Sequence, residues 1–195
     1  MTLKTLVLAG ATLFSTSALA SDWTIDPQHS EADFRVRHMG ISYVKGSLGA
    51  VSGTVHVDES NPTKSSVLAS IDVTQIDTRE PKRDGHLKSP DFFDVAKYPT
   101  ATFKSTKVER AGSGKLKVTG DLTMHGVTRQ VVLDVDGPSD PIKDPWGNAK
   151  VAATGTTQID RTNYGLVWNK SLDKGGVLVG NDIDVTISIE AGPKK

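Results

Sequence analysis

The chain has 195 residues and no cysteine, and its 23 Lys and Arg side chains balance 23 Asp and Glu side chains. With 36% hydrophobic residues, this composition is typical of a water-soluble domain with one core. It disfavours a nucleic-acid-binding protein that relies on a basic surface, and it excludes a disulfide framework, a thiolate metal site and a cysteine nucleophile.

The first twenty residues have the pattern of a secretory signal peptide. Lys4 precedes an apolar stretch, Thr5–Phe14, and Ala18-Leu19-Ala20 forms an A-x-A cleavage site. We therefore expect cleavage after Ala20, a mature domain over residues 21–195 and a periplasmic location. The alternative, an uncleaved anchor helix, is disfavoured because the apolar stretch is too short to span a bilayer. No cysteine is present to accept a lipid anchor, so no stable membrane insertion is expected.

Alternation of apolar and polar residues dominates the rest of the chain and predicts strands with one face in a core. The clearest segments are 66–74, 115–125, 127–135 and 182–190, and weaker ones are 22–26, 31–38, 47–57, 101–109 and 150–159. The turns that separate them include Asn61-Pro62, Ala111 to Gly114 and His125-Gly126, with a longer loop over 137–149. Short connections without alternating helices predict an antiparallel meander in a single domain.

A charged segment, 78–94, interrupts the strand pattern. Thr78 is a candidate N-cap, Pro81 follows close behind it, and Pro90 marks the end, which predicts a short capping helix. An aromatic loop with Phe92 and Phe93 comes next. The two rings either cap an opening of the domain or belong to the core under the loop. The charged segment is the expected entrance for a ligand, and the loop over 137–149 is the alternative entrance.

Sandwiches and barrels share this alternation, so the choice between them depends on the inward-facing side chains. The clearest strands place Val, Ala, Ile, Leu, Gly and Met on the inward face and no aromatic residue. An eight-stranded barrel is just wide enough to be filled by large side chains or to hold one slender ligand, and this small lining favours the ligand. We predict an all-β fold, an eight-stranded antiparallel barrel with a short capping helix.

Several motifs follow one another along the chain. They are Trp23-Thr24-Ile25-Asp26-Pro27, Arg83-Asp84-Gly85-His86-Leu87, Asp91-Phe92-Phe93-Asp94, the segment from Gly120 to Gly126, and Arg161-Thr162-Asn163-Tyr164-Gly165. Together they resemble the YceI family of lipocalin-like, polyisoprenoid-binding proteins, although Leu48 stands where that family usually has an aromatic residue. The resemblance implies an extended lipocalin-like barrel that holds a long prenyl or other lipid chain in its interior, in an exported protein without established catalysis. No cofactor is expected.

The residues expected to contact such a chain lie on inward faces of the strands and in the aromatic loop. They are Phe34, Val36, Val67, Ala69, Ile71, Val73, Phe92, Phe93, Phe103, Leu116, Val118, Leu122, Val131 and Leu133. His38, Arg83 and His86 are candidates for the ligand head group at the mouth of the barrel. Arg83 alternatively forms a structural salt bridge to Asp84 or Asp94.

The polar residues allow two other interpretations, a metal site and a hydrolase. A zinc site made by His29, His38 and His86 lacks any metal-ligand spacing, so we expect these side chains to hydrogen-bond to backbone and carboxylates instead. A hydrolase that uses Arg83, Asp84 and His86 with Ser30 or Ser89 lacks a nucleophile elbow, so no enzyme activity is predicted. The alternatives to a lipid-binding protein are an envelope scaffold with a filled core and an enzyme acting on lipid-linked substrates. A homodimer is left open.

Overall fold

The computed structural model describes residues 21–58 and 60–194, and the predicted signal peptide lies outside them. The strands are β1 (Ser21–Ile25), β2 (Glu31–His38), β3 (Ser42–Val57), β4 (Ser66–Asp72), β5 (Thr100–Gly112), β6 (Lys115–Met124), β7 (Val127–Asp136), β8 (Ile142–Lys143), β9 (Ala149–Asp160) and β10 (Val179–Pro193). The helices are α1 (Pro81–Lys88) and the 3-10 turns η1 (Pro62–Lys64), η2 (Val73–Gln75) and η3 (Arg161–Tyr164). Among the described helices, none is long and apolar enough to cross a membrane.

Within the described residues, eight strands close into an antiparallel barrel, as predicted. The order around the barrel is β2, β3, β4, β5, β6, β7, β9 and β10, and the β10–β2 pair completes the ring. Strand β1 continues the position of β2, because it pairs with the parts of β3 and β10 that β2 does not reach. The interruption between β1 and β2 is a turn over residues 26–30.

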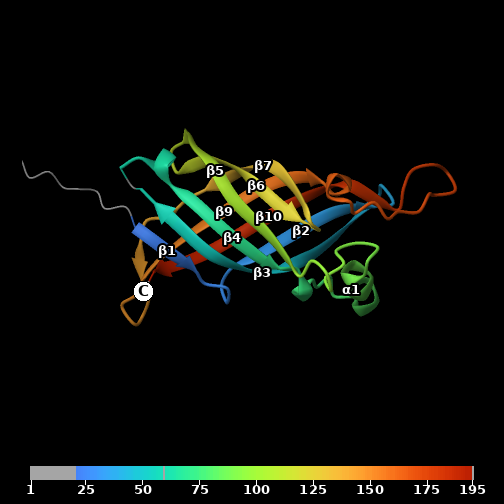
Figure 1. Ribbon diagram of the computed structural model, residues 1–195, viewed down its shortest axis with the longest axis horizontal. Coiled ribbons are helices and arrows are strands. Elements are labelled where there is room, and N and C mark those ends of the chain that lie inside the picture. The colour runs from blue at the N-terminus through green and yellow to red at the C-terminus, as the bar shows by residue number, and fades with distance from the viewer. Residues whose placement is uncertain (1–20, 59, 195) are drawn as a thin grey trace, which may run out of the picture.

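The two ends of the elongated barrel differ (Figure 1). One end, which we call the helix end, carries α1, the turn before β3 and the long connection between β9 and β10. The opposite end, which we call the terminal end, carries Ser21, Pro193, the β3–β4 connection and the connection from β7 to β9 over residues 137–148. Most strands therefore run the length of the barrel between two chemically distinct rims.

Buried side chains fill the helix end. Phe92, Phe93, Met124, Tyr164 and Leu166 are each less than 10% exposed and belong to one packed cluster. Phe92 lies 5.3 Å from Trp168 between ring centroids, and His86 packs edge-on against both rings. The aromatic loop therefore belongs to the core.

The structure differs from the sequence predictions at several element ends. Strand β3 begins at Ser42 instead of residue 47, β10 covers Val179–Pro193 instead of 182–190, and β8 lies within the predicted loop 137–149. The strand predicted over 66–74 stops at Asp72, whose carboxylate accepts the backbone N–H of Thr74 and starts η2. The predicted N-cap of the helix, Thr78, is wrong: the cap is Glu80, whose carboxylate accepts the N–H groups of Lys82 and Arg83. The predicted His125-Gly126 turn is present, with φ of 52° and 74°, the positive values that a two-residue hairpin turn requires.

Candidate functional site

A cavity of about 450 Å³ occupies the barrel between its middle and the terminal end. Strands β1, β3, β4, β5, β6, β7, β9 and β10 all contribute to its wall. The wall is almost entirely aliphatic, and its aromatic residues are Trp23 and Phe103. This volume falls in the range of roughly 300–1,000 Å³ that small-molecule sites occupy.

The inward-facing residues of the alternating strands form the wall, and a bulge and a glycine change its shape locally. Val67, Ala69 and Ile71 follow at every second residue of β4 and all line the cavity. On β5 the register shifts between Ser105 and Lys107, and this bulge brings Val108 to the same inner face as Phe103. The Phe103 ring lies against Gly120, where a Cβ would stand only 2.4 Å from the ring. Glycine at 120 is therefore what admits the aromatic ring into the barrel.

The cavity reaches the surface at the terminal end. Its lining there includes Asp58, Pro62 and Ser65 from the β3–β4 connection and the exposed segment Pro138–Pro141 before β8. We call these residues the mouth. The hydrogen bond from the Ser60 hydroxyl, and next the one from the Asn61 N–H, lower the pKa of Asp58. Among the described lining residues there is no Lys, Arg or His, so the mouth offers carboxylate and hydroxyl oxygens.

A second, much smaller cavity of about 70 Å³ lies in the helix end. Phe34, Phe92 and Phe93 line it together with Arg161, which belongs to one of the sequence motifs but was given no site role there. The Arg161 guanidinium is buried and donates to the carbonyls of Gly180, Leu166 and Val179. Burial lowers the pKa of Arg161. These contacts tie the β9–β10 connection to the barrel.

The predicted lining residues divide between these two places. Seven line the large cavity: Val67, Ala69, Ile71, Phe103, Leu116, Val118 and Leu133. Phe34, Phe92 and Phe93 line the small one, and Val36, Val73, Leu122 and Val131 line neither. Val73 is buried in η2 beyond the end of its strand, and Leu122 and Val131 pack against the clusters on both sides.

Several residues of the wall were not predicted. They include Trp23, Ile25, Val51, Val55, Val57, Val151, Ala153, Ile187 and Ile189. Ile187 and Ile189 belong to the regular alternation of 182–190, so the same signal that found β4 could have found them. The mouth segment Pro138–Pro141 has no such periodicity, but it belongs to the loop over 137–149 that the sequence offered as the alternative entrance.

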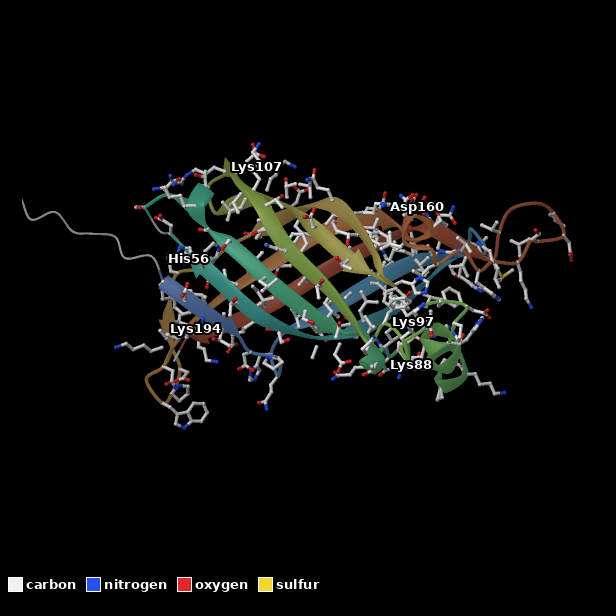
Figure 2. All side chains as sticks on the ribbon, viewed as in Figure 1. His56, Lys88, Lys97, Lys107, Asp160 and Lys194 are labelled. Carbon is white, nitrogen blue, oxygen red and sulfur yellow. The ribbon has the colours of Figure 1, made fainter. Side chains whose placement is uncertain are left out.

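His38, Arg83 and His86 do not line the large cavity. They belong to elements of the helix end, where the labelled Lys88 and Lys97 also lie, whereas His56 and Lys194 mark the terminal end (Figure 2). The predicted salt bridge of Arg83 is wrong. In the described structure its Nε donates to the Thr78 hydroxyl (2.7 Å) and its Nη2 to the Thr78 carbonyl (2.9 Å), and it forms no ion pair. His86 pairs with Asp91 at 2.9 Å.

His29 is also engaged by a carboxylate. Its Nδ1 lies 3.0 Å from Asp26, and one donor atom from each of Asp26, His29 and Glu190 falls within 4.8 Å of the others, a spacing compatible with a metal ion. The Lys150 ammonium already lies 3.3 Å from Asp26 and 2.8 Å from Glu190. Because this ammonium neutralises both carboxylates, the group is explained as an ion-pair network that joins the β1–β2 turn to β9 and β10.

Comparison with known proteins supports the barrel assignment. Residues 23–191 match the YceI-like domain family. A UPF0312 protein of Vibrio cholerae is 38% identical over 169 residues, which cover 85% of this chain and 88% of the relative. The crystal structure of Burkholderia cenocepacia BcnA superposes with a TM-score of 0.72 at 23% identity, covering 85% of this chain and 98% of that one. A polyisoprenoid binding domain from Saccharophagus degradans gives a TM-score of 0.63 at 15% identity, covering 88% and 98%.

Proposed function

This chain belongs to the YceI-like family, and from that premise we propose that it binds one long apolar lipid chain, of the prenyl or fatty type, in its large cavity. The observation that carries the proposal is an aliphatic cavity of about 450 Å³ that reaches the surface at one end. An unfilled apolar cavity costs stability, and each methylene that a ligand buries in it contributes roughly 0.8 kcal/mol before ordering costs. A hydrocarbon chain is the ligand class that such a wall favours.

The solved relatives support the same ligand class. One of them is described as a polyisoprenoid binding domain, and its barrel superposes on this one over 88% of this chain. A branched isoprenoid and an unbranched acyl chain both present apolar hydrocarbon surface to an aliphatic wall, so the wall distinguishes them little. We therefore expect selectivity for chain length and shape to be loose, because most of the described lining residues are aliphatic and make no directional contact with a hydrocarbon chain.

The head group is expected at the mouth. Asp58, Ser65 and the segment Pro138–Pro141 place carboxylate and hydroxyl oxygens there. An ionised Asp58 repels a phosphate and accepts hydrogen bonds from hydroxyl or amine groups. We therefore expect a neutral or cationic head group, and we move the head-group site from His38, Arg83 and His86 to the opposite end of the barrel.

The cellular role that follows is that of an exported carrier or store for such lipids. A lipid chain bound inside the barrel is shielded from water while the protein diffuses. A free membrane lipid cannot cross an aqueous space in this way, because its chain would be exposed to water. The signal peptide expected over residues 1–20 supports a periplasmic location for this role. The alternative of a scaffold with a filled core is disfavoured by the size of the cavity.

The test is extraction of the native protein. The protein is purified from its own envelope without detergent, extracted with organic solvent and analysed by mass spectrometry, with the same protein refolded from denaturant as the empty control. We expect about one equivalent of an apolar lipid in the native sample and none in the control. Native protein that carries no lipid, and that takes up no fluorescent prenyl analogue after refolding, would support the scaffold alternative instead.

A further inference from the structure

The β8–β9 hairpin presents large apolar side chains to water. Trp146 is 85% exposed and Ile142 is 67% exposed. We call residues 142–148 the hairpin tip. A tryptophan side chain that is this exposed buries little apolar area and contributes little to the stability of the fold. Its position in the tip therefore indicates a role other than stability.

The hairpin tip is built to hold its shape. The Asp144 carboxylate accepts the N–H of Trp146 at 2.9 Å, the N–H of Asn148 at 2.8 Å and the side-chain amide of Asn148 at 2.8 Å. The Asp144 N–H donates to the Asn148 carbonyl, and Gly147 takes a positive φ of 87° in the turn. None of these bonds uses the indole ring. The turn therefore fixes the backbone at Trp146 while leaving the ring free to contact something else.

The hairpin tip borders the mouth of the cavity. Pro138–Pro141, which line the cavity, lead directly into Ile142, and Ile142 pairs with Lys150 at the start of β9. A lipid chain that leaves the cavity through this mouth emerges beside the exposed apolar side chains. The same element thus joins the interior of the barrel to an apolar projection on the surface.

We propose that the hairpin tip docks the protein on a lipid bilayer and so brings the mouth of the cavity to the membrane surface, an inference that rests on the proposed function. A lipid held in the cavity has to pass between the barrel and a bilayer, and a mouth kept in water would expose the chain during that step. Indole rings favour the interface between head groups and acyl chains, where an apolar body and a polar N–H are both satisfied. Two isolated apolar side chains can insert into a bilayer without a shape-complementary surface around them, whereas a protein partner would need such a surface.

Charge indicates which bilayer the tip binds. Over residues 140–150 the acidic side chains of Asp140 and Asp144 balance the basic ones of Lys143 and Lys150. A neutral segment gains no attraction from anionic lipids, so docking depends on insertion of Trp146 and Ile142. We expect binding to zwitterionic vesicles that changes little with salt concentration.

The helix end supplies a matched control. Ile41 is 79% exposed and Val167 is 67% exposed, and they are the most exposed of the large apolar side chains described at this end. The large cavity does not extend to either residue. If exposed apolar side chains alone caused membrane binding, both ends would dock equally, whereas docking for lipid exchange requires the terminal end.

The experiment compares three proteins by flotation with phosphatidylcholine vesicles. They are the wild type, the double variant I142S/W146S and the control double variant I41S/V167S. We expect the ratio of bound to free protein to fall at least tenfold for I142S/W146S and to change less than twofold for I41S/V167S. Circular dichroism and thermal unfolding check that all three are folded. Equal flotation of the wild type and I142S/W146S, or a loss confined to I41S/V167S, overturns the inference.

A second measurement separates this inference from the proposed function. Binding of a fluorescent prenyl analogue is titrated in solution without vesicles, and its transfer from protein to vesicles is followed by stopped flow. We expect equal affinity in solution for all three proteins and at least tenfold slower transfer from I142S/W146S. A wild type that binds no analogue refutes the proposed function. A wild type that binds the analogue but releases it to vesicles no faster than I142S/W146S refutes only the docking role.

Discussion

Gly120 on β6 and Gly155 on β9 are both buried glycines of the barrel, but the space around them differs. A Cβ at Gly120 would stand 2.4 Å from the Phe103 ring and 2.6 Å from the Lys104 carbonyl. A Cβ at Gly155 would meet its nearest atom, on Val135, at 3.6 Å, which is ordinary van der Waals contact. One position therefore requires glycine and the other only tolerates it.

This difference predicts opposite effects of the same substitution. We expect Gly120→Ala to reduce the free energy of unfolding by about 1–3 kcal/mol, because the added methyl group overpacks the site. Gly155→Ala should raise it by about 0.5–1 kcal/mol, because alanine loses less conformational entropy than glycine in a strand. Urea denaturation of the two variants measures both changes. Equal destabilisation by the two substitutions would contradict the packing described here.

Ala69 tests where the ligand chain runs. Its side chain lines the cavity beside Phe103, whereas its neighbour Leu68 is 55% exposed on the outer face of β4. We expect Ala69→Trp to lower affinity for a fluorescent prenyl analogue at least tenfold, because the indole occupies the ligand's volume. Leu68→Trp is the matched control and should leave affinity unchanged. Undiminished binding by a folded Ala69→Trp protein would mean that the chain does not pass this point.

Asp26 makes stability depend on pH. The hydrogen bond to His29, then the N–H of Gln28 and Lys150, lower the pKa of Asp26 to about 2 from a usual 3.8. Since the folded protein holds this proton less tightly than the unfolded chain, the contribution is present above pH 3.8 and is lost as the pH falls towards 2. We expect Asp26→Asn to cost about 1–2 kcal/mol at pH 7. The difference from wild type should shrink below pH 4 in urea titrations at several pH values, and parallel curves would contradict the assignment.

At the scale of elements, α1 is anchored by a chain of hydrogen bonds at its start. The Thr78 hydroxyl accepts from Arg83 and donates to Asp84 at 2.5 Å, and the Thr78 N–H also donates to Asp84 at 2.8 Å. Burial acts to raise the pKa of Asp84, but these bonds from Thr78 outweigh it and lower the pKa. The segment that seals the helix end is therefore held by Thr78 and Asp84 rather than by an ion pair of Arg83.

Removal of this anchor should loosen the seal locally. We expect Asp84→Ala to cost about 1–3 kcal/mol, because it leaves the buried Thr78 N–H without an acceptor. Amide exchange over residues 77–99 should accelerate while the barrel strands stay protected. Asp91→Ala, which removes an exposed partner of His86, is the control and should cost less than about 1 kcal/mol. Faster exchange throughout the barrel would show that the segment is not a separate unit.

The elements could largely be predicted because strand alternation and turn residues are local signals. The predicted strand 31–38 coincides with β2, and the hairpin over 111–114 is where the sequence placed it. The Arg83 partner could not be predicted, since a guanidinium can pair with any nearby acceptor and only the fold shows that Thr78 is closer than Asp94. The same holds for the N-cap, because Thr78 and Glu80 are both able to accept from a helix start.

At the scale of the whole molecule, the wall of the cavity could be predicted, whereas the sequence left two places open for its mouth, the charged segment 78–94 and the loop over 137–149. Inward residues follow from the period of each strand, as Val67 and Ala69 do. Which end opens depends on how loops of irregular sequence pack over the rims. The aromatic residues Phe92 and Phe93 suggested an entrance at the helix end, but they are buried there beside Trp168. The Pro-rich segment Pro138–Pro141 lines the open end instead.

The exported form of the protein should begin at Ser21. Ala18 and Ala20 supply the small residues that signal peptidase requires, and Ser21 is the first residue of β1, where it pairs with Val57 of β3. N-terminal sequencing of protein recovered from the periplasm measures this directly. An exported protein that still begins with Met1 would contradict both the cleavage site and the periplasmic assignment.

The pairing of β10 with β2 closes the barrel between segments that are far apart in the sequence. The seam joins Arg35 to Asp184 and Ser30 to Glu190, partners separated by 149 and 160 positions along the chain. Contacts this remote form only after a large loss of chain entropy, which makes barrels of this kind slow to complete. Until β10 docks, the sheet from β2 to β9 is an open trough with two free edges and an apolar inner face. If the proposed lipid chain settles in that trough before the seam closes, it is enclosed as the barrel forms and does not have to enter through the mouth.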